Sequence, residues 1–301
     1  MPARPRYARL PTERANPRSR DLDRMTAAGI ARLMNREDAR AVRAVARALP
    51  RIARAVDTIV GRLRDRGRLF FVGAGTSGRL GVLEAAECPP TFGTPPSLVQ
   101  AIMAGGRASV FRSREGAEDD ARAARRAVGS RVRRGDVVVG VSASAVTPFV
   151  RSALEGAARA GAATVLVCCN PAAATARLPR GTVVVALDPG PEVVAGSTRL
   201  KAGTVTKLVL NTLTTAAMAR LGRIHGNRMV DVQPRSRKLR ERALRLVGEL
   251  AGVRRRDAAR ALAAAGGSVR LAVVVARTGW PVARARSELR RAGGSLRPFL
   301  G

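Results

Sequence analysis

The spacing of apolar positions changes along the chain, from a helical period at the front to short apolar runs in the middle. Up to about residue 65, apolar residues recur three and four positions apart, as in AVRAVARALPRIARAVDTIVGRL (41–63). This period predicts amphipathic helices, the first of them capped by Ser19 or Asp21. No strand pattern precedes Arg68 in the sequence.

Between residues 68 and 187, short apolar runs rich in β-branched residues alternate with helix-like stretches. The runs are LFFV (69–72), LVQAIMA (98–104), DVVVGVSA (136–143), ATVLVCC (163–169) and TVVVAL (182–187). Such runs are typical of strands buried on both faces, and helical connections between them make the strands parallel. The pattern predicts an α/β fold with a doubly wound, five-stranded parallel sheet.

Helix-like stretches separate these runs and continue to the end of the chain. They are SGRLGVLEAAE (77–87), REGAEDDARAARRAV (114–128), TPFVRSALEGAARAG (147–161), a long segment at about 197–221, and three short helices after residue 236. The first of these helices is expected to stop at Cys88-Pro89-Pro90. The expected organisation is an N-terminal helical segment (1–65), a sheet domain (66–235) and a small helical C-terminal domain (236–301).

The composition narrows the class of protein. A hydrophobic fraction of 46% is that of a globular chain, and no apolar run approaches the ~20 residues that span a bilayer. The basic N-terminus has no apolar stretch behind it and is not expected to be a secretory signal. The three cysteines, Cys88, Cys168 and Cys169, cannot form a disulfide framework, which favours a cytoplasmic location.

The formal net charge of +33 points first to nucleic acid, because arginine and lysine neutralise phosphates. However, only Lys201, Lys207 and Lys238 are lysines, and the arginines are spread along the whole chain. Aromatic residues, which stack on bases, make up 3% of the sequence. We attribute the charge to the codon bias of a GC-rich genome and expect neither a nucleic-acid partner nor a membrane.

The stretch GAGTSGRLG (73–81) follows the first apolar run and predicts a strand, a glycine turn and a helix. Such a turn binds phosphate through backbone N–H groups at the helix N-terminus. It is not a Walker A loop, because Arg79 and Leu80 stand where lysine and a hydroxyl are required. A dinucleotide site requires an acidic residue about 20 positions further on, and none lies between Cys88 and Arg114. An NADP site stays open as the weaker alternative, because Arg107, at the end of the second apolar run, suits the additional phosphate of NADP.

A phosphate monoester fits the turn better, because Thr76 and Ser77 place two hydroxyls inside it. A second loop rich in hydroxyls, SASAVTP (142–148), follows the third apolar run. In a parallel sheet both loops lie at the carboxyl edge, where ligands bind. Serine and threonine in turns also bond to the local backbone, and that role stays open for each of them.

Carboxylates follow these loops in the sequence. Glu84 and Glu87 lie on the helix expected after the turn, and EGAEDD is expected to place Glu115, Glu118 and Asp119 on one helical face. The second group either takes part in chemistry or complements the helix dipole. A carboxyl pair with one member protonated and the other ionised suits acid–base chemistry on a sugar phosphate.

The sequence does not predict a metal centre or a serine-hydrolase triad. The only histidine is His225, and the cysteines lack the spacing of zinc ligands. No Gly-x-Ser-x-Gly motif follows a predicted strand. His225 is therefore expected to have a structural role.

Taken in order, these stretches resemble the N-acetylmuramic acid 6-phosphate etherases, a family with the sugar isomerase (SIS) fold. The resemblance covers nearly the whole chain, in LPTERANPRSRDLD, MNREDARAVRAV, GRLFFVGAGTSGRLGVLEAAECPPTFGTPP, AIMAGG, EGAEDD, GPEVVAGSTRLKAGTVTKLVLN and HGNRMVDV. The related glucokinase regulatory protein shares parts of this pattern but is much longer. The resemblance implies an αβα sandwich of the SIS type.

The resemblance also implies an activity and a site. The enzyme would be a cytoplasmic, homodimeric carbon–oxygen lyase of peptidoglycan recycling, which removes D-lactate from N-acetylmuramic acid 6-phosphate without a metal or redox cofactor. Glu87 would be the acid at the leaving lactate, and Glu118 the base at C2, with Asp119 as the alternative. By the same match Thr76, Ser77, Ser144 and Thr147 would hold the phosphate, and Glu192, Ser197 and Lys201 would line the pocket.

The second loop departs from the family pattern. Where the family usually reads Ala-Ser-Gly-Arg-Thr-Pro, this chain has Ala143-Ser144-Ala145-Val146-Thr147-Pro148. A glycine is lost where the backbone is expected to need either a positive φ or a close approach to the ligand, and an arginine charge is lost beside it. This change favours an alternative, a non-catalytic sugar-phosphate-binding regulator, whereas the retained Glu87 and Glu118 favour the enzyme.

Overall fold

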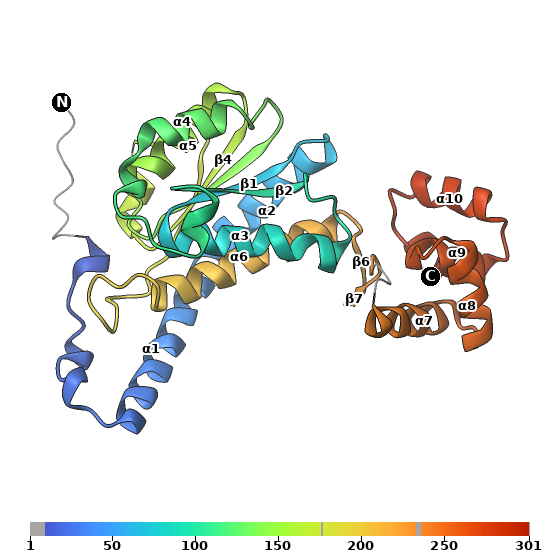
Figure 1. Ribbon diagram of the computed structural model, residues 1–301, viewed down its shortest axis with the longest axis horizontal. Helices are drawn as coiled ribbons and strands as arrows, with labels where there is room; N and C mark the ends of the chain where they lie inside the picture. Colours follow the sequence, from blue (N-terminus) through green and yellow to red (C-terminus); the bar gives the residue numbers. More distant parts are fainter. Residues whose placement is uncertain (1–9, 176, 233–235, 301) are drawn as a thin grey trace. The chain divides into compact units, whose positions relative to one another are not determined.

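A computed structural model describes residues 10–175, 177–232 and 236–300 (Figure 1). The chain forms two compact units, each made of two segments. We call residues 1–85 with 97–214 the sheet unit, and residues 86–96 with 215–301 the helical unit. The three-part division expected from the sequence remains a prediction.

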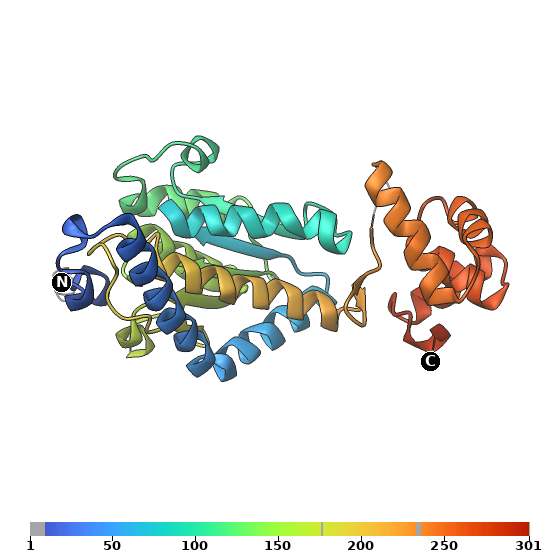
Figure 2. The ribbon, with the colours of Figure 1, turned by 90° about the horizontal axis from the view of Figure 1, so that it is seen from below.

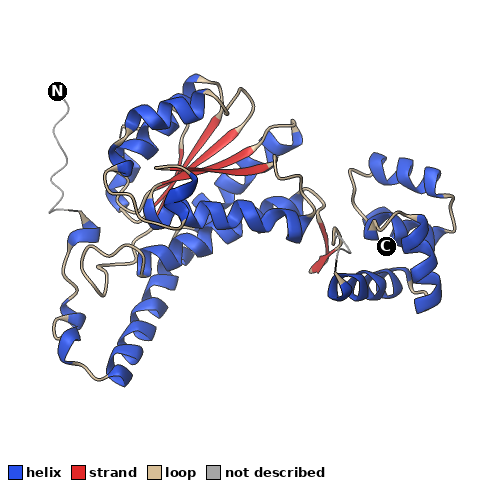
Figure 3. Ribbon diagram, in the orientation of Figure 1, coloured by secondary structure: helices blue, strands red, loops and turns tan. Residues whose placement is uncertain are grey.

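The sheet unit is built on five parallel strands, as the apolar runs predict (Figure 3). They are β1 (Leu69–Gly73), β2 (Val99–Met103), β3 (Val137–Val141), β4 (Ala163–Cys168) and β5 (Val183–Ala186), in the order β2-β1-β3-β4-β5. Since β1 and β3 are neighbours, with Gly73 paired to Val141, the loops that follow them leave the sheet side by side. This is the topological switch point, where open α/β sheets bind ligands.

Helices cover both faces of the sheet. On one face, α4 (Ala121–Gly129) and α5 (Pro148–Arg159) bury a cluster that includes Phe70 and Leu154. On the other face lie α2 (Leu49–Arg64), which contacts β3, β4 and β5, and α3 (Gly75–Phe92), which packs against Phe71. All five positions of β1 and of β3 are buried, which explains their apolar runs without polar alternation.

The remaining elements of the sheet unit flank this core. They are η2 (Pro11–Glu13), η3 (Pro17–Ser19), η4 (Leu22–Arg24), α1 (Ala27–Arg47), η5 (Arg107–Val110), η6 (Ala117–Asp119), η7 (Pro171–Thr175) and the long helix α6 (Lys201–Arg220), which continues into the helical unit. Both ribbon views show α6 running beside α3 (Figures 1 and 2). The first long helix, α1, is capped by Thr26, which accepts a hydrogen bond from the N–H of Gly29, and not by Ser19 or Asp21 as expected.

Two helix boundaries differ from those expected. The helix α3 does not stop at Pro89-Pro90 but continues to Phe92. Proline lacks the N–H that would bond to the preceding turn, but its carbonyl can still accept a hydrogen bond from the following turn. The Pro89 carbonyl accepts from the N–H of Gly93, and the helix ends there because Gly93 has a φ of +62°. The second difference is in EGAEDD, where Gly116 is left-handed and η6 is a 3₁₀ turn, so that α4 begins only after Asp120.

The helical unit has its own apolar core. Its described elements are the hairpin β6 (Ile224–His225) and β7 (Arg228–Met229), then α7 (Arg237–Ala251), α8 (Arg255–Ala264), α9 (Val269–Thr278), α10 (Val282–Arg291) and α11 (Arg297–Leu300). The three expected helices are α8, α9 and α10, and the structure adds α7 and α11. No single described helix is long and apolar enough to cross a membrane; the bent pair α8–α9 passes that test together, by length and composition only.

Candidate active site

The turn after β1 brings the strand and the following helix unusually close together. A side chain on Gly78 would put its Cβ 2.3 Å from the Met103 sulfur and 2.6 Å from the Gly73 carbonyl oxygen. Gly75, at a φ of +53°, starts α3 directly after the turn. The first N–H groups of a helix have no partners within it, so this turn presents donors and a positive helix end to an anion. Thr76 and Ser77, both partly exposed, lie in this first turn.

The second loop is a turn closed by its own hydroxyls. The Ser142 and Thr147 hydroxyls are 2.8 Å apart, and the Ala145 N–H donates to Ser142 Oγ at 3.1 Å. Asn170 donates to the Ser144 carbonyl at 2.9 Å, and Ser144 Oγ accepts from the Val146 N–H at 3.3 Å. Ser142 is therefore a structural hydroxyl. The two predicted phosphate ligands of this loop lie on a preformed turn.

Ala145 has the backbone conformation expected of the glycine that it replaces. Its φ is +65°, and its side chain is 4% exposed within the core cluster of the α4–α5 face. A non-glycine residue in this region costs about 1–2 kcal/mol, because its Cβ crowds the following carbonyl. The second loop therefore holds Ala145 in a conformation that favours glycine, at the expense of local strain.

We predict that Ala145→Val destabilises the protein by about 2 kcal/mol or more, whereas Ala145→Gly changes the free energy of unfolding by less than about 1 kcal/mol. A branched Cβ adds strain at a positive φ, while glycine relieves strain but loses a buried methyl group and gains unfolded-state entropy. Urea denaturation of the three proteins measures both effects. Equal stabilities for the valine and glycine variants would contradict the strained turn.

Glu118 lies beside the first turn rather than on a long helix. It belongs to η6, and with Ala74 and Gly75 it lines a cavity of about 190 Å³ in the sheet unit. Partial burial and the nearby charges of Asp119 and Glu115 raise the pKa of Glu118. The expected helical face of three carboxylates is wrong, because the left-handed Gly116 interrupts it, but Glu118 still lines one cavity with Gly75 of the first turn.

Arg79 also lines this cavity, and the sequence indicated only that it stands where a Walker A loop requires lysine. The Arg79 side chain donates to the carbonyl oxygens of Val110 and Ser109, at 2.8 and 3.0 Å, and to Ser113 Oγ at 3.3 Å. Arg79 thus fastens the start of α3 to the segment that leads to Glu118. A single sequence gives no signal for such contacts across 30 residues.

The two carboxylates on α3 have different environments. Glu84 is 4% exposed, pairs with Lys207 on α6 and accepts a hydrogen bond of 2.7 Å from the Thr214 hydroxyl. The Glu84 side chain thus joins α3 to α6 within the sheet unit. Glu87 is exposed one turn later, in the part of α3 that belongs to the helical unit, and it has no hydrogen bond or ion pair within the described residues.

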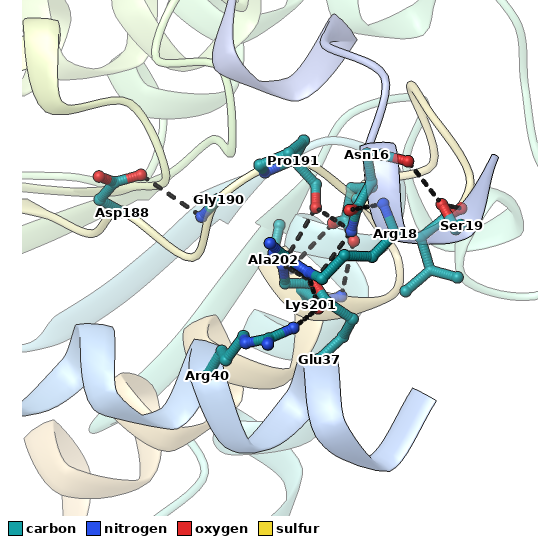
Figure 4. A network of polar contacts seen from close by, with 12 residues as sticks. Asn16, Arg18, Ser19, Glu37, Arg40, Asp188, Gly190, Pro191, Lys201 and Ala202 are labelled. Carbon is teal, nitrogen blue, oxygen red and sulfur yellow. Dashed lines mark hydrogen bonds and ion pairs between the residues drawn. The ribbon is translucent and has the colours of Figure 1, made fainter. Parts of the chain in front are cut away.

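Lys201 belongs to a buried polar network (Figure 4), and hydrogen bonds join Glu192 to it. The Glu192 carboxylate accepts from the N–H groups of Lys201 and Ala202, both at 2.9 Å, and so caps α6. Burial raises the pKa of Glu192 even though these two hydrogen bonds oppose the shift. Lys201 is fully buried, and its Nζ donates to Glu37 at 2.8 Å and to the Pro191 carbonyl at 3.0 Å. Ser197 is partly exposed on the loop before α6.

Glu37 on α1 is the centre of this network, and the sequence analysis did not single it out. It is fully buried and bonds to Lys201, Asn16, Arg18 and Arg40. Burial alone would raise the pKa of Glu37, but these four hydrogen bonds outweigh it and lower the pKa. The network ties the N-terminal segment and α1 to the loop that carries Glu192 and Ser197.

No group of three or more histidine, cysteine, aspartate or glutamate side chains in the described part of the chain is arranged to hold a metal ion. His225 lies in the β6–β7 hairpin of the helical unit. Burial, together with the nearby charges of Arg297 and Arg228, lowers its pKa. The cavity of the sheet unit and the two turns present hydroxyls, backbone N–H groups, carboxylates and the guanidinium groups of Arg79 and Arg114.

Comparison with known proteins identifies the family of the chain. Residues 51–158 match the glucokinase regulatory protein N-terminal SIS domain. The chain is 52% identical over 266 residues to the N-acetylmuramic acid 6-phosphate etherase of Symbiobacterium thermophilum, covering 88% of each protein. It is 49% identical over 294 residues to that of Gloeobacter violaceus and 46% over 293 residues to that of Synechocystis, each covering 97% of this chain and 95% of the relative. The chain therefore belongs to the N-acetylmuramic acid 6-phosphate etherase family.

Proposed function

We propose that this protein is an N-acetylmuramic acid 6-phosphate etherase, a lyase that yields N-acetylglucosamine 6-phosphate and D-lactate. The observation that carries the proposal is the cavity of the sheet unit, which joins an anion-binding turn to a carboxylate of raised pKa, Glu118. A general base close to a phosphate site suits proton abstraction from a sugar phosphate.

The reaction begins in the open-chain sugar, where the C1 aldehyde acidifies the proton at C2. Glu118 removes this proton, the electrons form the C2–C3 double bond, and the C3–oxygen bond breaks. Glu87 donates a proton to the departing lactate oxygen. Water then adds at C3 of the unsaturated aldehyde and a proton returns to C2, which balances the overall hydrolysis of the ether.

The phosphate is assigned to the turn at the start of α3, with the hydroxyls of Thr76, Ser77, Ser144 and Thr147. Backbone N–H groups fix the anion, and hydroxyls supply further donors. Ser197 is assigned to the pocket lining. Glu192 and Lys201 are assigned to the same region as residues that position its loop, because their polar atoms already bond within the network.

The proposal extends to the cellular setting. The enzyme acts as a homodimer in the cytoplasm, where it recycles peptidoglycan sugars. Three cysteines without a disulfide suit a reducing compartment. Size-exclusion chromatography with light scattering measures the oligomeric state directly.

The decisive experiment incubates the purified protein with N-acetylmuramic acid 6-phosphate and measures D-lactate. We expect turnover by the wild type and a loss of about a hundredfold in Glu87→Gln, since general acid catalysis contributes about 10²–10⁴-fold. Glu84→Gln is not a suitable control, because Glu84 holds α3 to α6. Glu155→Gln, on α5, is a matched control of the same chemistry and is expected to keep wild-type turnover.

The alternative is a regulator that binds sugar phosphate without turnover. It predicts that N-acetylglucosamine 6-phosphate raises the thermal midpoint while the wild type releases no lactate. The closed turn at Ala145 weighs against this alternative, because the second loop is held by its own hydrogen bonds with Ala145 at a positive φ.

A further inference from the structure

Two arginines line the cavity that contains Glu118, and they differ in their contacts. Arg79 is held by the carbonyl oxygens of Ser109 and Val110. Arg114 lines the same cavity, but its guanidinium has neither a hydrogen bond nor an ion pair within the described residues. A guanidinium presents five N–H donors in a fixed fork that matches a carboxylate or a phosphate. Arg114 is therefore available to bind an anion.

The position of Arg114 selects between the two anionic groups of the proposed substrate. The phosphate, on C6, is assigned to the turn at Gly75, where helix N–H groups receive it. Glu118 acts at C2, next to C3, which bears the lactyl ether and its carboxylate. Arg114 precedes Glu118 by four residues on the same short segment and lines the same cavity, which favours the lactyl carboxylate over the C6 phosphate as its partner.

A second unused polar group lies on the wall of this cavity. The Ser109 side chain is 3% exposed, and its hydroxyl has no hydrogen-bond partner within the described structure. An unpaired buried hydroxyl is unfavourable until a partner arrives. Together, a free guanidinium and an unpaired hydroxyl favour a polar ligand in this cavity.

We propose that Arg114 binds the lactyl carboxylate of the substrate and thereby distinguishes the substrate from the lactate-free product. The inference rests on the proposed function. A bidentate pair holds the C3 substituent in one orientation, so that its ether oxygen leaves in a fixed direction relative to C2. The contact is made equally in the ground state and the transition state, and Arg114 is therefore a binding residue that sets KM.

The test compares Arg114→Ala, Arg114→Lys and Arg112→Ala in turnover of N-acetylmuramic acid 6-phosphate and in calorimetric binding of N-acetylglucosamine 6-phosphate. These two sugars differ only in the lactyl group. We expect Arg114→Ala to raise KM by about tenfold or more with kcat within about threefold of wild type, because a charge-assisted hydrogen bond is lost. The Kd of N-acetylglucosamine 6-phosphate should stay within about twofold of the wild-type value. The KM of Arg114→Lys should lie between that of the wild type and that of Arg114→Ala.

The exposed Arg112 is the matched control, since it carries the same charge on the same segment without lining the cavity. Arg112→Ala is expected to resemble the wild type. Equal weakening of both sugars by Arg114→Ala, an unchanged KM, or a fall in kcat alone would each overturn the inference while leaving the proposed function intact. Absence of lactate release by the wild type would instead overturn the proposed function, and this inference with it.

Discussion

A Glu118→Gln variant is expected to lose about a thousandfold in kcat for D-lactate release while keeping its fold. The amide has nearly the shape of the carboxylate but cannot accept the C2 proton, and a positioned general base contributes about 10²–10⁴-fold. Because η6 is short and exposed, the substitution removes no buried ion pair from the sheet unit. Stability should therefore stay within about 0.5 kcal/mol of wild type.

Exchange of the C2 proton with heavy water isolates the step assigned to Glu118. The variant should lose this exchange, and Asp119→Asn, the neighbouring carboxylate, should retain it. Exchange that continues unchanged in Glu118→Gln would remove Glu118 as the base. Exchange lost only in Asp119→Asn would transfer the role to its neighbour.

The raised pKa of Glu118 sets the pH dependence of the same reaction. A base works in its ionised form, so kcat/KM should rise with pH through a pKa above the ordinary carboxyl value of 4.5. The negative charges of Asp119 and Glu115 contribute to the raised pKa of Glu118. Glu115→Gln should therefore move the rising limb of the kcat/KM–pH profile to lower pH. A limb that stays in place would leave burial and the charge of Asp119 as the causes of the raised pKa.

The strands and the glycine turn after β1 could be predicted from the sequence because their signals are local. A strand buried on both faces is a continuous apolar run, and the turn at Gly73–Gly78 requires glycine for steric reasons that are visible in the spacing. Similarly, the positive φ at Ala145 was implied by the family's glycine at that position. Each of these features depends on residues within a few positions of one another.

The features that could not be predicted depend on contacts far apart in the sequence or on competing local rules. Two consecutive prolines predict the end of a helix, yet α3 continues to Phe92, because Pro89 still accepts the bond from Gly93. The carboxylates of EGAEDD have helical spacing, and this spacing does not indicate the left-handed conformation of Gly116. Glu37 and Lys201 are 164 residues apart, and nothing in either local sequence indicates that they form a buried pair.

Removal of Glu37 is expected to have the largest effect on stability. In Glu37→Leu the Lys201 ammonium stays fully buried without its carboxylate, and breaking a buried ion pair from one side costs about 3–5 kcal/mol. Lys201→Met should cost less, because Glu37 keeps Arg18 and Arg40 as partners. The double variant Glu37→Leu/Lys201→Met should be less destabilised than the sum of the single variants, since no ammonium is left unpaired.

Chemical denaturation of the four proteins, with Asp38→Asn as the control, tests this energetic coupling. Asp38 is the adjacent carboxylate on α1 and is partly exposed, so its substitution should change the free energy of unfolding by no more than about 0.5 kcal/mol. Lactate assays on the folded fraction of Lys201→Met show whether the network also positions the loop of Glu192 and Ser197. Additive single effects, or a Glu37→Leu variant as stable as Asp38→Asn, would mean that the buried pair does not hold α1 to the start of α6.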